Sequence, residues 1–235
     1  MELRPETESA RESRHKRPVR ITHWVNAMSF LALTVSGVGI LLAHPRFYWG
    51  ETGYFDTPAA FELPIKPVLE ELWVRAWGRN VHFMAAWIAV GNGLAYAGWG
   101  FYTGHFRTRF LPGREQLEWK SISALIGKHL RLKNPSEASG YNILQKFAYS
   151  CVVFGLLPLL ILSGLTMSPG VTAAFPQLFT LFGGRQSART IHFILANVLL
   201  LFVVIHVFMT FLAGFRGNVM PMITGGPRGQ TGVKR

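Results

Sequence analysis

The stretch TIHFILANVLLLFVVIHVFMTFLAGF, residues 190–215, carries no charged residue and holds two histidines, His192 and His206. A helix needs about 20 apolar residues to cross the roughly 30 Å hydrocarbon core of a bilayer, so this stretch is long enough to span one. The two histidines are 14 residues apart. On a helix that spacing is about 21 Å along the axis and about 40° short of four full turns. One membrane helix would therefore present an imidazole near each surface of the bilayer, on a single face.

Three more uncharged windows of sufficient length occur in the 235-residue chain, at 21–45, 81–105 and 147–184. Apolar residues make up 49% of the sequence and charged residues 15%, against about 25% charged in a typical soluble domain. These windows predict an all-α membrane protein, a bundle of four transmembrane helices. The helices are expected at about residues 20–43, 80–103, 143–167 and 188–213.

The ends of the chain differ from this apolar middle. Residues 1–20 hold four acidic and six basic residues without an apolar run, so we expect no signal peptide there. We predict a polar cytoplasmic tail at 1–17, a four-helix membrane domain at 18–216, and a flexible cytoplasmic tail at 217–235, which is rich in glycine and proline.

The net charge of +12 is distributed unevenly along the sequence. Lysine and arginine number six before the first window, eight between the second and third and four after the fourth, but only four and two in the other connections. The positive-inside rule places the richer segments in the cytoplasm, so both termini and the middle loop are expected there. Membrane topology explains the excess of basic over acidic residues. We therefore expect these charges to face the lipid bilayer rather than nucleic acid.

Four of the eight histidines lie at the ends of predicted helices, at two depths. His23 is near the cytoplasmic end of the first helix and matches His206, whereas His82 is near the outer end of the second and matches His192. Ionisable side chains inside a membrane are costly, and each is a functional-site hypothesis by default. A single histidine could equally hydrogen-bond to a neighbouring helix or reach the interface. The matched depths instead favour two pairs, His23 with His206 and His82 with His192.

Two imidazoles from facing helices at one depth are the axial ligands that a six-coordinate haem iron needs. Zinc or copper would require three or four ligands at one level, where these levels offer two. The single cysteine, Cys151, lies within an apolar window, and the chain has no Cys-x-x-Cys-His motif for covalent haem attachment. The sequence therefore predicts two non-covalent b-type haems, an inner one on His23 and His206 and an outer one on His82 and His192.

Several small residues and one proline lie within the predicted helices. Gly37 follows His23 by 14 residues, which places it on the same helix face at the outer level, where a missing side chain would let the outer porphyrin approach the backbone. Pro158 is expected to kink the third helix. Other glycines could admit a porphyrin in the same way or simply pack helices together; they are Gly91, Gly93, Gly98, Gly155 and Gly164.

The segment Arg20-Ile21-Thr22-His23-Trp24, His82 at the start of the second helix and the spaced pair on the fourth resemble the cytochrome b561 / nickel-hydrogenase b-type cytochrome superfamily. That superfamily includes membrane subunits of hydrogenase, formate dehydrogenase and thiosulfate reductase. The outer-loop string HPRFYWGETGY, residues 44–54, looks most like the thiosulfate-reductase-type cytochrome b subunit.

The resemblance implies a multi-pass subunit of the bacterial inner membrane. Such a subunit would exchange electrons between a periplasmic redox partner, of molybdenum type or similar, and the quinone pool. In relatives the quinone site lies beside the inner haem. The corresponding environment for quinone or for haem propionates would include Arg20, Asn26, His105, Arg107 and Arg216. Ordinary contacts with lipid headgroups would explain the arginines equally well, and His44 could support the outer haem or compete as a ligand.

Several alternatives remain open from the sequence. The aromatic outer loop at 46–79 suits an interfacial belt as well as a docking platform, and residues 115–131 could form an amphipathic surface helix. The chain shows no flavin, nicotinamide or molybdenum motif, so we expect an electron-transfer subunit rather than a complete enzyme. The alternatives are a self-contained membrane haem reductase for a soluble acceptor, and a haem-free transporter or scaffold that uses histidines as a proton relay.

Overall fold

The computed structural model describes residues 15–53, 57–64, 75–106 and 143–225. Within them four long helical segments cross the molecule: α1 (Arg17–Ala43), α2 (Arg75–Tyr102), α5 (Ile143–Cys151) continued by η4 and α6, and α9 (Arg185–Leu212). The amphipathic stretch predicted at 115–131 lies outside the described residues, as does Arg107. The four helices predicted from the apolar windows are thus present, with α2 beginning five residues earlier than expected.

In the part of the chain that the structure describes, three helical segments are long and apolar enough to cross a membrane: Arg17–Ala43, Phe147–Thr166 and Arg185–Leu212. Helix α2 has 28 residues but does not reach the same hydropathy. Its sequence contains five glycines, two asparagines and several tryptophan and tyrosine residues, which lower its mean hydropathy without adding charge at its centre. The chain is therefore a mostly helical membrane protein with three spans assigned on length and composition.

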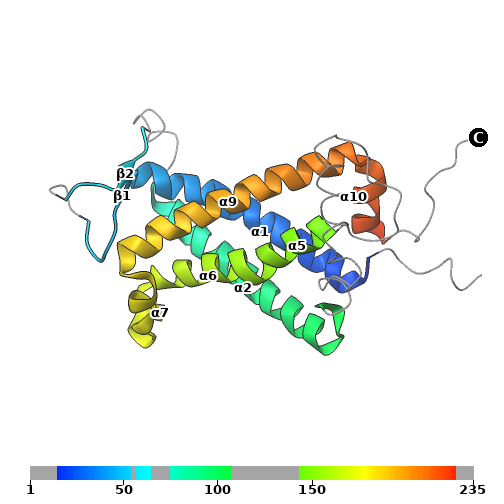
Figure 1. Cartoon of the computed structure of the whole chain (residues 1–235), viewed down its shortest axis with the longest axis horizontal. Helices are drawn as coiled ribbons and strands as arrows, with labels where there is room; N and C mark the ends of the chain where they lie inside the picture. Colours follow the sequence, from blue (N-terminus) through cyan, green and yellow to red (C-terminus); the bar gives the residue numbers. More distant parts are fainter. Residues whose placement is uncertain (1–14, 54–56, 65–74, 107–142, 226–235) are drawn as a thin grey trace, which may run out of the picture.

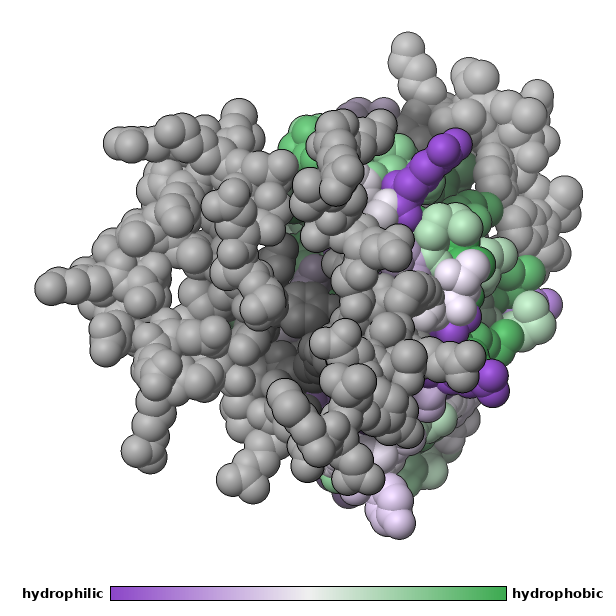
Figure 2. Space-filling model, turned by 90° about the vertical axis from the view of Figure 1, so that its right-hand side faces the viewer, coloured by the Kyte–Doolittle hydropathy of each residue, from purple (hydrophilic) through white to green (hydrophobic). Residues whose placement is uncertain are grey.

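The helices associate in two pairs, because α1 packs along α2 and α6 packs along α9. An asparagine joins the first pair: the Asn92 side-chain amide donates to the Thr22 carbonyl at 3.0 Å and to Asn26 Oδ1 at 2.8 Å. Large apolar side chains remain exposed along α9, among them Leu201 at 60% and Val204 at 58%. Exposed apolar surface of this extent is what a bilayer would cover. Seen from the α10 end, the described surface carries hydrophobic residues directly beside hydrophilic ones (Figure 2).

The third helical segment changes its geometry midway. A π-helical turn, η4 (Val152–Leu156), joins α5 to α6 (Leu157–Thr166), and the Leu157 N–H bonds to the Val152 carbonyl five residues back. Pro158 follows directly and lacks the N–H that an α-helical bond to Phe154 would need. A π-turn is a common way to absorb such a break. The sequence predicted a kink at Pro158, and the structure has a π-turn that ends two residues before this proline.

The outer connection after α1 forms a short ribbon that supports α9. Strand β1 (Arg46–Phe47) pairs antiparallel with β2 (Phe61–Glu62), and the Arg46 guanidinium bonds to the Glu62 carboxylate at 3.0 Å. Beyond β1, the Gly50 carbonyl accepts from the backbone N–H groups of Gln186 and Ser187 at 3.0 and 3.2 Å. It thereby satisfies two of the unpaired donors at the start of α9.

The aromatic residues of this connection divide between two roles. Phe47 is 2% exposed and its ring lies 4.6 Å from Phe61 and 4.5 Å from Phe193, while Tyr48 is also buried and its carbonyl accepts from Thr190 Oγ1 at 2.7 Å. Trp49, in contrast, is 58% exposed. The first two therefore fix the ribbon against α9, and Trp49 presents an aromatic surface outward.

Two short helices, α7 (Pro169–Ala174) and α8 (Gln177–Phe182), lead from α6 to α9, and α10 (Phe215–Thr224) follows α9. The sequence predicted a flexible tail from residue 217, but most of α10 lies there. The Arg20 guanidinium donates to the carbonyls of Met222 and Ile223, and Trp24 Nε1 donates to Met222 O at 3.1 Å. These donors satisfy carbonyls at the end of α10, which would otherwise be unpaired. In Figure 1, α10 and the start of α1 lie at one end of the molecule, opposite the ribbon.

Candidate functional site

The structure brings His82 of α2 and His192 of α9 together at the ribbon end of the molecule. Their ring centroids are 6.3 Å apart and their planes meet at 69°. Metal–imidazole bonds are about 2.0 Å long and a ring nitrogen lies about 1.2 Å from its centroid, so two imidazoles on one iron have centroids roughly 6.4 Å apart. The separation of these rings therefore fits an iron between them.

Both rings of this outer pair are held through Nδ1. His82 Nδ1 lies 3.1 Å from Ser36 Oγ, and the ring also bonds to the Leu33 carbonyl. His192 Nδ1 lies 3.1 Å from Ser163 Oγ and 3.0 Å from the carbonyl of Leu160. A carbonyl only accepts, so the contact with Leu160 O assigns the ring hydrogen of His192 to Nδ1. The Ser36 hydroxyl donates to Ala32 O, so it accepts from His82 Nδ1 in the same way. This assignment leaves the Nε2 lone pair of each ring for a metal.

A glycine lies beside each ring. A Cβ atom on Gly37 would stand 3.6 Å from His82 Cε1, and one on Gly164 would stand 3.2 Å from His192 Cε1. We predicted that Gly37 would lie at the outer level, and it does lie there, beside the imidazole of His82. That it admits a porphyrin stays a prediction. A Cβ at Gly91, Gly93, Gly98 or Gly155 would meet no atom of the described residues within 4 Å.

The inner pair, His23 and His206, is arranged differently. The two rings are close enough to interact electrostatically. His23 Nδ1 is buried and has no hydrogen-bond partner among the described residues. The His206 ring stacks at 6.1 Å on Phe202 of the same helix and meets the edge of Tyr149 at 6.3 Å. A buried nitrogen without a partner is costly, and this one fits a site in which the ring binds a further group.

The other predicted residues occupy separate positions at the inner end. Arg20 bonds to the last carbonyls of α10, and Asn26 accepts from Asn92. His105 belongs to an aromatic cluster, with its ring centroid 4.8 Å from Trp99. Arg216 is exposed at the start of α10, and Arg107 lies outside the described part of the chain. The structure therefore places Arg20 and Asn26 on α1 close to His23 in sequence, but with protein partners of their own.

His44 caps the outer end of α1, beyond the spanning segment. Its backbone carbonyl accepts from the Arg189 guanidinium. Burial lowers the pKa of the His44 imidazole, and the positive charges of Arg189 and Arg79 lower it further. His44 is thus a neutral neighbour of the outer site under physiological conditions.

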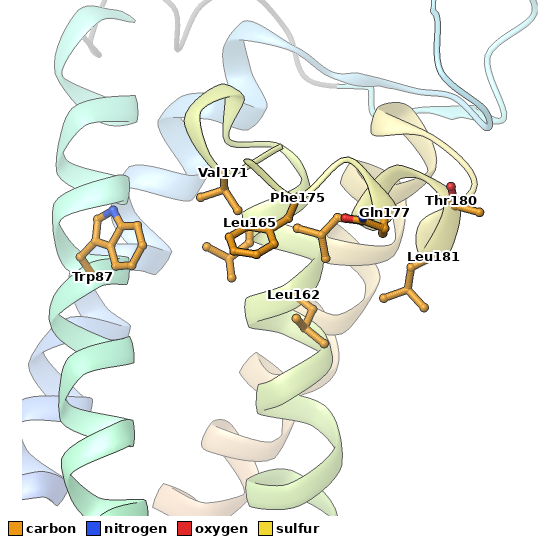
Figure 3. Close-up of a pocket in the computed structure, with 9 residues that line it drawn as sticks. Trp87, Leu162, Leu165, Val171, Phe175, Gln177, Thr180 and Leu181 are labelled. Carbon is orange, nitrogen blue, oxygen red and sulfur yellow. The ribbon is translucent and has the colours of Figure 1, made fainter. Parts of the chain in front are cut away.

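An apolar cavity of about 850 Å³ opens between α2 and α6, beneath α7 and α8. Trp87 of α2 faces Leu165 and Phe175 across it (Figure 3). Leu162 and Leu165 line it from α6, the helix that also carries Ser163 and Gly164. Its lining also includes Val171, Gln177, Leu178, Thr180 and Leu181.

The serines were not recognised from the sequence, although a signal was present. Residues 33–37 read LTVSG and residues 160–164 read LILSG. Each copy of this Leu-x-x-Ser-Gly motif lies on the helix that faces one outer histidine, α1 for His82 and α6 for His192. A search for short repeats shared by the first and third apolar windows would have found both.

Long apolar helices that carry histidines facing one another, as His82 and His192 do, are typical of the b-type cytochromes of membranes. The sequence matches the family described as prokaryotic cytochrome b561 over residues 14–225, and the chain belongs to that family.

Named relatives are subunits of redox complexes. The chain is 30% identical over 210 residues to a protein of Azospira oryzae named as a protein-methionine-sulfoxide reductase subunit, YedZ1, covering 85% of this chain and 94% of the relative. It is 27% identical over 205 residues to a protein named as a Ni/Fe-hydrogenase B-type cytochrome subunit of Azotobacter vinelandii, covering 83% and 78%. A similarly named subunit of Cupriavidus necator is 25% identical over 224 residues, covering 90% and 84%. No solved structure matches the chain.

Proposed function

We propose that the chain is a di-haem cytochrome b subunit that carries electrons across the membrane, with His82 and His192 as ligands of the outer haem and His23 and His206 as ligands of the inner one. The observation that carries this proposal is the outer pair, whose rings are 6.3 Å apart with both Nδ1 atoms engaged. Two imidazoles so arranged would each keep an Nε2 lone pair with which to hold haem iron.

The topology that fits this role has four membrane spans and both termini in the cytoplasm. In it, α2 is a span in addition to the three assigned on length and composition. Helix α2 has 28 residues, about 42 Å at the usual rise, which is ample for the hydrocarbon core. It supplies His82 and packs along α1. We take residues 18–216 as the membrane domain, and the flanking segments at 1–17 and 217–235 as cytoplasmic, in accord with the positive-inside rule.

The residues of this chain would set the depth of each haem and would hold the histidine rings in place. Haem held by these histidines would supply a one-electron change between ferrous and ferric iron. Helix α9 sets the two levels about 21 Å apart through the 14-residue spacing of its histidines. The hydroxyls and carbonyls of α1 and α6 hold the outer rings in place, so little rearrangement accompanies the redox change.

We place the redox partner on the periplasmic side and quinone on the cytoplasmic side of the bacterial inner membrane. The named relatives are subunits of a reductase and of hydrogenases, which favours a separate catalytic partner. Trp49 offers an exposed aromatic surface at the outer end. At the inner end, the residues proposed for quinone or propionates are Arg20, Asn26, His105, Arg107 and Arg216.

A reduced-minus-oxidised spectrum with a haem count per chain tests the core of this proposal. The full chain, purified from haem-replete cells, should contain two haems with b-type spectra, and acidified acetone should extract both. A colourless preparation would overturn the proposal, as would haem that stays on the chain after extraction. A redox subunit that co-purifies would separate an electron-transfer subunit from a self-contained reductase.

The assignment of sides needs oriented proteoliposomes and a quinone-site inhibitor. We expect the inhibitor to shift the spectrum or potential of the inner haem during reduction by quinol. A shift confined to the outer haem would reverse the assignment. Because an electron crossing most of the bilayer works with or against about 2.3 kcal/mol per 100 mV, transfer between the two haems should also respond to membrane potential.

A further inference from the structure

Ser36 and Ser163 are fully buried serines inside apolar helices, each at 0% exposure. A serine at such a position usually bonds only to a carbonyl of its own helix. Both serines make this bond: Ser36 Oγ donates to Ala32 O at 2.6 Å, and Ser163 Oγ donates to Leu160 O at 2.9 Å. Because each hydroxyl hydrogen is engaged in this way, the oxygen has lone pairs left to accept from a neighbour.

The neighbour in each case is an outer histidine. Ser36 Oγ accepts from His82 Nδ1 at 3.1 Å, and Ser163 Oγ accepts from His192 Nδ1 at 3.1 Å. Each ring finds a second acceptor in the carbonyl three residues before its serine, Leu33 or Leu160. The same three groups, leucine carbonyl, serine hydroxyl and glycine, therefore surround both rings, although the motifs lie on different helices.

We propose that the two Leu-x-x-Ser-Gly motifs, through Ser36 and Ser163, are matched positioning sites that fix the tautomer of both outer haem ligands and lower the potential of that haem. This inference rests on the proposed function. An Nδ1–H group that donates to an oxygen acceptor makes its imidazole a more basic ligand. A more basic ligand favours ferric over ferrous iron, so the outer haem is harder to reduce than it would be without the serines.

The inner pair provides an internal reference. His23 Nδ1 has no hydrogen-bond partner among the described residues, and the aromatic neighbours of His206 provide ring contacts. A change at Ser36 or Ser163 should therefore alter the outer haem and leave the inner haem as it is.

The test uses the full-length protein with Ser36→Ala, Ser163→Ala and the double variant. Matched controls are Thr34→Val and Thr166→Val, because Thr34 Oγ1 and Thr166 Oγ1 bond to Phe30 O and Leu162 O on their own helices at 2.8 and 2.9 Å. The measurements are a potentiometric titration that resolves each haem and the g values of the oxidised low-spin haems. The outer haem is identified by its absence from His82→Ala.

We expect an upward shift of the outer midpoint potential in each serine variant, larger in the double variant, with the inner haem and both threonine controls unchanged. Selective loss of the outer haem, restored by Ser36→Thr or Ser163→Thr, would also support the proposal. An unchanged outer haem in the double variant would overturn it, as would an equal shift in Thr166→Val or loss of both haems together. If the unmodified protein binds no haem, the proposed function itself fails, whereas two haems with insensitive serine variants reject only the positioning role.

Discussion

The outer and inner histidine pairs differ in how the protein supports them, although the residue types are the same. At the outer level both Nδ1 atoms are bonded to a serine, and a glycine lies beside each ring. At the inner level His23 Nδ1 has no hydrogen-bond partner within the described ranges. The same residue type thus has hydrogen-bond partners at one depth and lacks one, at His23 Nδ1, at the other, so residue type alone does not determine the surroundings of each pair.

The two ends of the molecule also differ in the elements that surround them. The ribbon and Gly50 fix the first turn of α9, two turns from His192, through backbone hydrogen bonds. The inner end is covered by α10, which is attached to α1 through Arg20 and Trp24. The outer pair is therefore held by neighbouring helices, whereas at the other end an added helix, α10, is attached to α1 beside His23 in sequence.

The largest effect should come from removing a ligand. His82→Ala and His192→Ala should each deplete the outer haem, while His23→Ala and His206→Ala should deplete the inner one, so that each variant retains about one haem per chain. A haem count with resolved redox titration measures this. His15→Ala is the matched control and should keep both haems, because His15 precedes α1 and belongs to neither pair. Loss of the same haem from His23→Ala and His82→Ala would show that the pairing is wrong.

A methyl group at Gly164 should have the next largest effect, and one at Gly37 should have a much smaller effect. The Cβ of Gly164→Ala would lie 3.2 Å from His192 Cε1, whereas that of Gly37→Ala would lie at an ordinary contact distance of 3.6 Å from His82 Cε1. Overpacking costs about 1–3 kcal/mol, so Gly164→Ala should lower outer-haem retention on heating and Gly37→Ala should change it little. Melting followed at the Soret band compares them. Equal effects of the two substitutions would mean that the distance from the added Cβ to the imidazole ring does not determine haem retention.

Much of the fold could be predicted from the sequence because the relevant signals are local. Apolar windows fix where helices lie, and the 14-residue spacing of His192 and His206 follows from helix geometry alone. The partners of the serines could not be predicted in this way. A serine in an apolar helix looks like any small residue until it is known which helix it faces, and that depends on the packing of α1 on α2 and of α6 on α9.

Helix α10 was missed for a different reason. Its segment contains Gly217 and Pro221, and Gly225 follows it, a composition that indicates a turn or a tail. The structure overrides this preference through tertiary contacts, because Arg20 and Trp24, about 200 positions earlier in the chain, donate to its terminal carbonyls. Local composition cannot report on a contact of that sequence separation.

A smaller effect is expected when α10 is detached from α1. Trp24→Phe removes the Nε1 donor to Met222 O, and Arg20→Gln shortens the side chain that reaches Met222 and Ile223. Each lost hydrogen bond is worth about 1 kcal/mol. Amide hydrogen exchange over residues 215–224 should become faster, with the ribbon at 46–62 unaffected. Trp49→Phe, at the opposite end, is the control. Unchanged exchange in the double variant would mean that α10 is held by other contacts.

The smallest effect concerns pH and is confined to the outer end. Burial, followed by the charges of Arg189 and Arg79, lowers the pKa of His44 below its ordinary value, which is about 6.5 in an unfolded chain. The unfolded state therefore binds more protons than the folded state as pH falls below that value. The contribution of His44 to stability is thus fully present above about pH 6.5 and is lost as pH falls towards the lowered folded pKa.

His44→Gln removes this titration while keeping a polar side chain of similar size. The melting temperature should fall between pH 7.5 and pH 5.5 in the unmodified protein, and the fall should be smaller in His44→Gln. Arg79→Gln should also reduce it, because one of the charges that opposes protonation of His44 is gone. The outer haem should be released earlier than the inner haem in the acidic melt of the unmodified protein, and this difference should narrow in His44→Gln. If the acid sensitivity of both haems is the same in all three proteins, His44 does not couple proton binding to the outer site, and the contrast between the two ends is independent of pH.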